Sequence, residues 1–180
     1  MEVDEKKLRS GAAESSADLN FFHSLSLFSL NIFTKMATPY AAPGETNLTT
    51  LLSTLKVTLS PEIFVFITLP GLKLPPASLQ VQMSFREAEG TTIITTQDSA
   101  NAYHMEYTFP CKMITLNIHS SLEAVGFMAV IAAKLAEKGI GVNPVSGYYH
   151  DHCFVPLGKE EEAMKALQDL AIEAQEKMEI

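Results

Sequence analysis

One stretch of the chain, residues 111–177, constrains the fold more than any other. Ile114, Leu116 and Ile118 alternate with polar residues, a pattern that predicts a half-buried strand. The residues that follow have apolar side chains at helical spacing and predict a helix over 121–138. Its apolar face consists of Leu122, Val125, Ala129, Ala132 and Leu135. A strand that runs directly into a helix is the first half of a β-α-β-β-α unit.

The second half of that unit follows at once. Residues 141–146 and 153–157 predict two strands joined by a turn over 148–152. Residues 159–177 predict a helix with one apolar face and a run of glutamates near its start. The order β-α-β-β-α is that of a ferredoxin-like plait that lacks only its last strand.

The predicted start of the first helix has two interpretations. Ser120-Ser121-Leu122-Glu123 has the spacing of a capping box, in which Ser120 and Glu123 would satisfy backbone N–H groups of the helix. The same groups could instead bind a ligand. At the other end, Gly139 can adopt the left-handed conformation that ends many helices.

Residues 46–109 predict a smaller unit with the order α-β-β-β-α. Thr46 or Asn47 is the expected cap of its first helix. The predicted elements are a helix at 47–57, strands at 62–69, 79–87 and 91–96, and a short helix at 97–104. We therefore expect an α+β fold of two ferredoxin-like units, the second spanning 110–178, with antiparallel sheets and helices on one face. The two units could interlock in one shared sheet or pack side by side.

Residues 1–45 differ from the rest, and we expect a disordered or weakly ordered extension. The apolar part, 19–33, is too short and too polar for a membrane span. The acidic residues that precede it argue against a secretory or mitochondrial leader. A short interfacial or docking helix remains an alternative interpretation of this segment. Met36 is a plausible alternative start.

Charge and cysteine content narrow the class of function. The net charge is −8 and the sequence has no cluster of Lys and Arg, which argues against binding nucleic acid through a basic surface. Cys111 and Cys153 lie in apolar, strand-like surroundings, as buried free thiols do in a reducing compartment. We therefore expect a cytoplasmic protein.

Three runs in the second unit together resemble the ACT domain of the CASTOR type. They begin at Ser120, Leu135 and Ser146, and the most distinctive piece is Asp151-His152 followed by Phe154-Val155-Pro156. The first unit resembles the partner unit of short two-unit ACT-like proteins. The resemblance implies a regulatory protein that is not an enzyme, needs no cofactor and binds a small ligand, usually a free amino acid.

The resemblance also implies where a ligand would bind. The start of the first helix offers unpaired N–H groups to a carboxylate, and a nearby carboxylate could bind an ammonium group. Two groups of residues match the contacts that ACT domains make with ligands, and Asn143 lies two residues after a position where many of them have asparagine. The helix-start group is His119, Ser120, Ser121, Leu122 and Glu123; the second is Gly147, Tyr148, Tyr149, His150 and Asp151.

Two other classes of function remain open. His150 and His152 could share a metal ion with a third ligand, in a small metal-dependent hydrolase. Alternatively, the chain could be an assembly module without a ligand. A plait that lacks its last strand has an open sheet edge, and on that ground we expect a homodimer.

Overall fold

A computed structural model describes residues 44–71 and 73–179. The predicted extension therefore lies outside the described residues, except for Gly44 and Glu45. The elements are α2 (Leu48–Ser53), β1 (Val57–Leu59), β2 (Phe64–Pro70), β3 (Val81–Arg86), β4 (Gly90–Thr96), α3 (Gln97–Ala102), β5 (Thr108–Leu116), α4 (Phe127–Glu137), β6 (Asn143–Ser146), β7 (Asp151–Pro156) and α5 (Glu160–Glu176).

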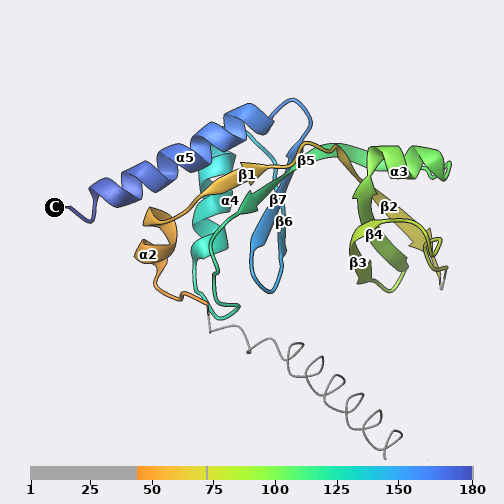
Figure 1. The fold of residues 1–180 in the computed structure, drawn as a ribbon, viewed down its shortest axis with the longest axis horizontal. Coiled ribbons are helices and arrows are strands. Elements are labelled where there is room, and N and C mark those ends of the chain that lie inside the picture. The colour runs from red at the N-terminus through yellow and green to blue at the C-terminus, as the bar shows by residue number, and fades with distance from the viewer. Residues whose placement is uncertain (1–43, 72, 180) are drawn as a thin grey trace, which may run out of the picture. The chain divides into compact units, whose positions relative to one another are not determined.

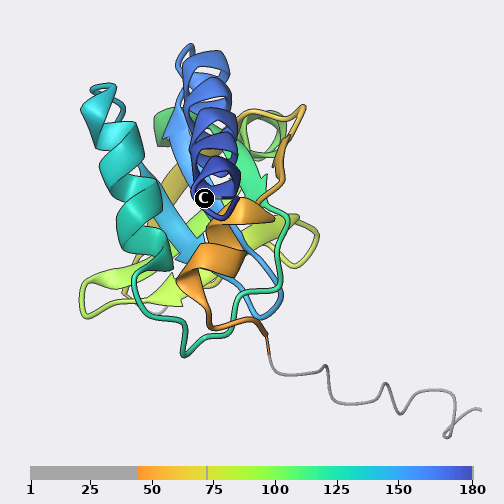
Figure 2. The ribbon, with the colours of Figure 1, turned by 90° about the vertical axis from the view of Figure 1, so that its left-hand side faces the viewer.

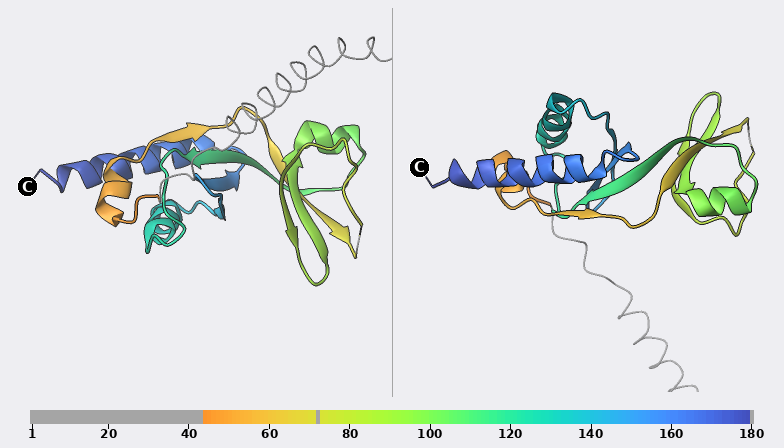
Figure 3. Two further views of the ribbon diagram at one scale, coloured as in Figure 1. Left: turned by 60° about the horizontal axis from the view of Figure 1, so that its bottom comes forward. Right: turned by 90° about the horizontal axis from the view of Figure 1, so that it is seen from above.

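All seven of these strands form one antiparallel sheet (Figure 1). The strand order is β3-β4-β2-β5-β7-β6, and β1 also pairs with β5. The nine-residue strand β5 pairs with β2 near its start and with β1 near its end. Figure 3 shows β5 passing from one half of the sheet into the other.

The second plait is complete, which corrects the prediction that its last strand is missing. β1 pairs antiparallel with β5, Val57 opposite Leu116 and Leu59 opposite Ile114. The order β1-β5-β7-β6 is that of a ferredoxin-like sheet whose last strand comes from an earlier part of the chain. The edge that we expected a second copy to cover is therefore occupied by the chain itself. The homodimer stays a prediction, without that argument for it.

The first plait uses the same strand β5. Its strands lie in the order β3-β4-β2-β5, with α3 between β4 and β5 in sequence. The position of its first helix is taken by the connection between β2 and β3, where Leu79 is buried. The two units thus interlock through a shared strand, one of the two predicted arrangements. The division of the chain at 109/110 stays a prediction.

The largest core cluster lies between the sheet and helices α2, α4 and α5. It includes Leu51, Ile114, Ile131 and Leu167, none of which is exposed. Figure 2 shows α4 and α5 side by side over the sheet. Phe64, Ile94, Cys111 and Phe154 form a second cluster. Cys111 and Cys153 belong to different clusters, and both are free thiols.

One predicted helix is shorter in the structure, and another ends as predicted. The helix expected at 47–57 is α2, which ends at Ser53, because the β-branched residues after it pair with β5 as strand β1. Asn47 is its N-cap, as predicted, and accepts a hydrogen bond from Thr50 N. The end of α4 follows the prediction: Ile140 N donates to Leu135 O and Gly139 N to Ala136 O, the two bonds of a Schellman motif.

Candidate functional site

The connection between β5 and α4 departs most from the prediction. α4 begins at Phe127, not at 121, and its N-cap Gly126 has φ 89°, a left-handed conformation. The predicted capping box is therefore wrong. Ser120 bonds to a different strand, and Ser121 Oγ accepts a hydrogen bond from Glu123 N within the loop. Residues 117–126 form a loop that leads into the helix.

The loop is held by the chain segment that precedes α2. Glu45 N donates to His119 O, and Ser121 N donates to Glu45 O. These bonds satisfy backbone groups of the loop and fix its position beside the segment that precedes α2. Gly44 lies so close that a Cβ atom there would sit 2.5 Å from Ser121 N. A side chain at residue 44 would therefore displace the loop.

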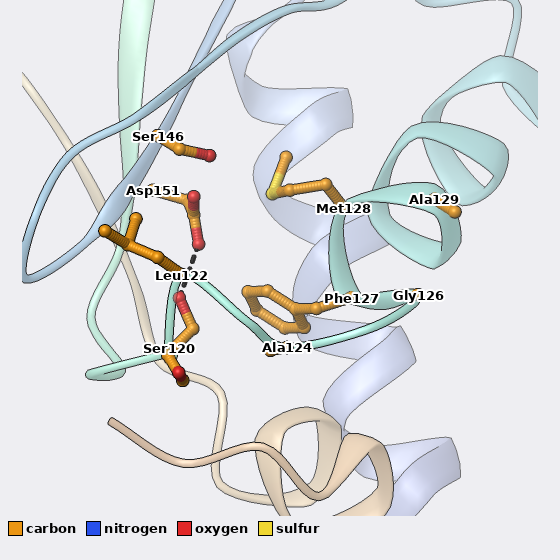
Figure 4. Close-up of a pocket in the computed structure, with 10 residues that line it drawn as sticks. Ser120, Leu122, Ala124, Gly126, Phe127, Met128, Ala129, Ser146 and Asp151 are labelled. Atoms are coloured by element: carbon orange, nitrogen blue, oxygen red, sulfur yellow. Dashed lines mark hydrogen bonds between the residues drawn. The ribbon is translucent and has the colours of Figure 1, made fainter. Parts of the chain in front are cut away.

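This loop and the first turn of α4 line an open pocket of about 190 Å³ (Figure 4). Most of its wall comes from the loop and the helix, and strands β6 and β7 contribute one residue each. The lining residues are Ser120, Ser121, Leu122, Ala124, Gly126, Phe127, Met128, Ala129, Ser146 and Asp151.

Asp151 is the only ionisable side chain in this lining. It is the first residue of β7, not part of a turn as predicted, and it pairs with Leu116 and Ser146. The alternation of β7 places it on the same side of the sheet as Cys153 and Val155, which face the helices. Its side chain therefore points toward the start of α4.

The Asp151 carboxylate is almost fully buried, with 5% of the residue exposed. Its Oδ2 accepts a hydrogen bond of 2.7 Å from Ser120 Oγ. Figure 4 shows its other oxygen pointing away from Ser120. Within residues 44–71 and 73–179, no Lys, Arg or His forms a salt bridge with it. A buried carboxylate without a cationic partner is costly, so the pocket favours a cation.

The start of α4 supplies the opposite polarity. The first bond within the helix that involves the cap runs from Val130 N to Gly126 O. The N–H groups of Phe127, Met128 and Ala129 precede it and have no intrahelical carbonyl to bind. No side chain caps them, and all three residues line the pocket. The pocket thus joins an anion-favouring helix end to a cation-favouring carboxylate.

The structure brings together only part of the predicted ligand-binding set. Ser120, Ser121, Leu122 and Asp151 line the pocket, whereas the other residues lie outside its lining. His119 packs against Tyr148 and Tyr149, with ring centroids 6.5 and 5.5 Å away. Glu123 and Asn143 are exposed, Gly147 N donates to His150 O, and His150 Nδ1 lies 3.2 Å from Ile118 O.

Six lining residues were not predicted. Phe127, Met128 and Ala129 were assigned to the interior of a longer helix, and no ligand contact was expected from there. Gly126 was the available signal, because a glycine directly before an apolar run can separate a loop from a helix. Ala124 and Ser146 have no comparable signal in the sequence, because only the folded chain brings them to the pocket.

The metal-site alternative rests on His150 and His152. His152 Nδ1 lies 3.0 Å from Thr115 Oγ1, so the two histidine rings have different partners. In the part of the chain that the structure describes, no group of three or more His, Cys, Asp or Glu side chains could hold a metal ion. Desolvation by burial, and then the nearby His150, lower the pKa of His152, and Asp151 partly offsets this change.

The two thiols are protonated at neutral pH. Burial raises the pKa of Cys153 to about 12, and the negative charge of Asp151 adds to the effect. Burial alone raises the pKa of Cys111 to about 12. A thiol with such a pKa is a poor nucleophile.

None of the helices in residues 44–71 and 73–179 is long and apolar enough to cross a membrane.

Two models of the ACT domain match the chain, over residues 43–112 and 108–169. The five residues that the matches share, 108–112, lie in β5, the strand that belongs to both plaits. Sequence and topology therefore agree on an overlap of two domains. No curated protein matches the chain significantly.

Solved structures add to this result. A Vibrio cholerae protein of unknown function, described as a possible transport protein, is 40% identical; the match covers 69% of this chain and 95% of that one, with a TM-score of 0.63. An Agrobacterium tumefaciens protein is 17% identical, with coverages of 65% and 89% and a TM-score of 0.56. Clostridium acetobutylicum aspartate kinase, described as an allosteric enzyme, is 10% identical, with coverages of 70% and 36% and a TM-score of 0.54. The last two similarities show the fold alone. The chain belongs to the ACT-domain family and has two interlocked ACT domains.

Proposed function

We propose that this protein is a non-catalytic regulatory protein that binds a free amino acid in the pocket between β5 and α4. ACT domains are typically regulatory modules that bind small ligands, and the matches to this family support that class of function. The amino acid, the CASTOR-type subclass, the cytoplasmic location and the homodimer are further parts of the proposal.

One observation carries the choice of ligand. Asp151 and the first turn of α4 line the same small pocket, with opposite electrostatic preferences. An α-amino acid has a carboxylate and an ammonium group on one carbon atom. The carboxylate would accept hydrogen bonds from the N–H groups at the helix start, and the ammonium group would donate to Asp151.

The test compares the binding of an amino acid with the binding of two analogues, each of which lacks one of its two charged groups. Titration calorimetry would measure the full chain with leucine, with its α-keto acid, which lacks the ammonium group, and with its amine, which lacks the carboxylate. The rest of the twenty amino acids follow in a thermal-shift screen, where a ligand at a hundred times its Kd stabilises by about 2.7 kcal/mol. We expect binding only when both charged groups are present.

The matched variants are Asp151→Asn and Asp169→Asn. Each removes one negative charge, but Asp169 lies on α5 and pairs with Lys165. We expect Asp151→Asn to weaken binding by about 10- to 100-fold, the value of a charged hydrogen bond, and Asp169→Asn to leave it unchanged. If no amino acid binds, or if both variants bind like the wild type, the proposal is wrong.

An assembly role remains the second candidate because Leu122 and Val125 are 70% and 84% exposed beside the pocket. Exposed apolar side chains that adjoin a pocket are common at interfaces between proteins. Sedimentation of the full chain with and without the bound amino acid would show whether copies associate there. A Leu122→Ser, Val125→Ser variant that sediments like the wild type would count against this surface.

A further inference from the structure

We propose that the pocket selects amino acids with an uncharged, apolar side chain. This inference rests on the proposed function and goes beyond it, because the ammonium and carboxylate groups are common to all amino acids. The selection arises because, once those two groups are bound, the pocket lining has no further ionisable side chain to pair with a charge on the ligand's side chain.

The α-ammonium and α-carboxylate groups of a bound amino acid would occupy both polar features of the pocket, Asp151 and the helix start. Among the ten lining residues, Asp151 is the only one with an ionisable side chain. If it binds the ammonium group and the helix start binds the carboxylate, no lining side chain is left to neutralise a further charge. A ligand side chain with a charge would lose part of its water without gaining a partner of opposite charge in the lining, which disfavours its binding.

The rest of the wall is suited to an aliphatic side chain. Leu122, Phe127 and Met128 contribute apolar side chains, and Ala124, Gly126 and Ala129 leave space between them. Figure 4 shows Phe127 and Met128 extending from the first turn of α4. Phe127 is buried, whereas Met128 is half-buried. A methionine side chain adapts to ligands of different shape, which suits it to this position.

The small volume of the pocket supports the same choice. A pocket of about 190 Å³ is below the usual range for drug-sized ligands, roughly 300–1,000 Å³. A ligand of amino-acid size would fill it, and its side chain would contact the apolar wall.

The decisive measurement compares norleucine with ornithine. The two differ only by replacement of a terminal methyl group with an ammonium group, so size and chain length are matched. Calorimetry with the full chain should show norleucine binding at least about tenfold more tightly than ornithine. Glutamine and glutamate give the same comparison for a negative charge, and glutamine should bind more tightly. Equal or tighter binding of the charged member, with the dependence on Asp151 intact, would overturn the inference while the proposed function stands.

Variants at Met128 test the apolar wall directly. Met128→Glu places a carboxylate in the wall and should raise the affinity for ornithine relative to norleucine at least about tenfold, whereas Met128→Leu should keep the preference for norleucine. Leu122→Glu should change the relative affinities in the same direction, and because Leu122 is exposed, this substitution should lower the stability of the fold little. Unchanged preferences in both charged variants would show that these side chains do not face the ligand. Failure of every amino acid to bind the wild type would overturn the proposed function and this inference together.

Discussion

At the scale of single residues, the pocket depends on a carboxylate that faces the core. Asp151 lies on the helix-covered side of β7, and its neighbour His152 bonds to Thr115. The two residues are adjacent in sequence, but because side chains alternate along a strand, they lie on opposite sides of the sheet. Asp151 therefore faces the start of α4, whereas His152 faces the other side of the sheet.

His152 makes a testable contribution to stability. Burial lowers its pKa in the folded protein below the ordinary value of 6.5. As the pH falls through that value, the unfolded chain binds a proton at this residue and the folded chain does not, so stability is lost. Urea unfolding of wild type and His152→Gln between pH 8 and pH 5 should show a steeper loss of unfolding free energy in the wild type. Parallel curves would contradict the expectation.

At the scale of elements, α2 and β1 belong to the second plait although they precede the first in sequence. α2 is a single short helix, and alone it would not be stable in water. Its stability comes from packing, because Leu51 is fully buried in the cluster that α4 and α5 also form. β1 then completes the sheet beside β5.

We therefore expect Leu51→Ala to lower the free energy of unfolding by about 2–5 kcal/mol, the range for truncation of a buried leucine. Thr49→Ala is the matched control, because Thr49 is exposed on the same helix. It should change stability by less than about 0.5 kcal/mol. Denaturant unfolding measures both. Small effects of similar size would mean that α2 does not pack as described.

At the scale of the whole described structure, β5 joins the two ACT domains, and we expect them to unfold as one cooperative unit. Phe154 on β7 packs edge-to-face against Phe64 and Phe66 on β2, with ring centroids 5.7 Å apart in each pair. A cluster that contains residues of both plaits should transmit a loss of packing from one to the other. Neither domain should unfold alone.

Phe154→Ala tests that cooperativity. We expect a loss of about 3–5 kcal/mol, the range for truncation of a buried phenylalanine. Native-state hydrogen exchange should show the same loss for the most protected amides of β4, which belongs to the first plait, and of β7. Faster exchange confined to β6 and β7 would show two separate folding units.

The elements themselves were largely predictable from the sequence. The alternation at Ile114 and Leu116, the apolar face of α5 and the Gly139 helix end are local patterns, and each depends on residues close together in the chain. Such patterns follow from the periods of strand and helix. Ser120 and Asp151, which the resemblance to the ACT domain placed in the ligand-binding set, line the pocket, and their role in binding stays a prediction.

The sequence by itself determined the α+β class and most of the elements. Tertiary structure alone decided that β1 completes the second plait, that β5 serves both plaits, and that Glu45 pairs with the loop ahead of α4. Each of these features is a pairing between segments far apart in the chain. No local pattern encodes such a pairing, because the backbone groups that form it are the same in every residue.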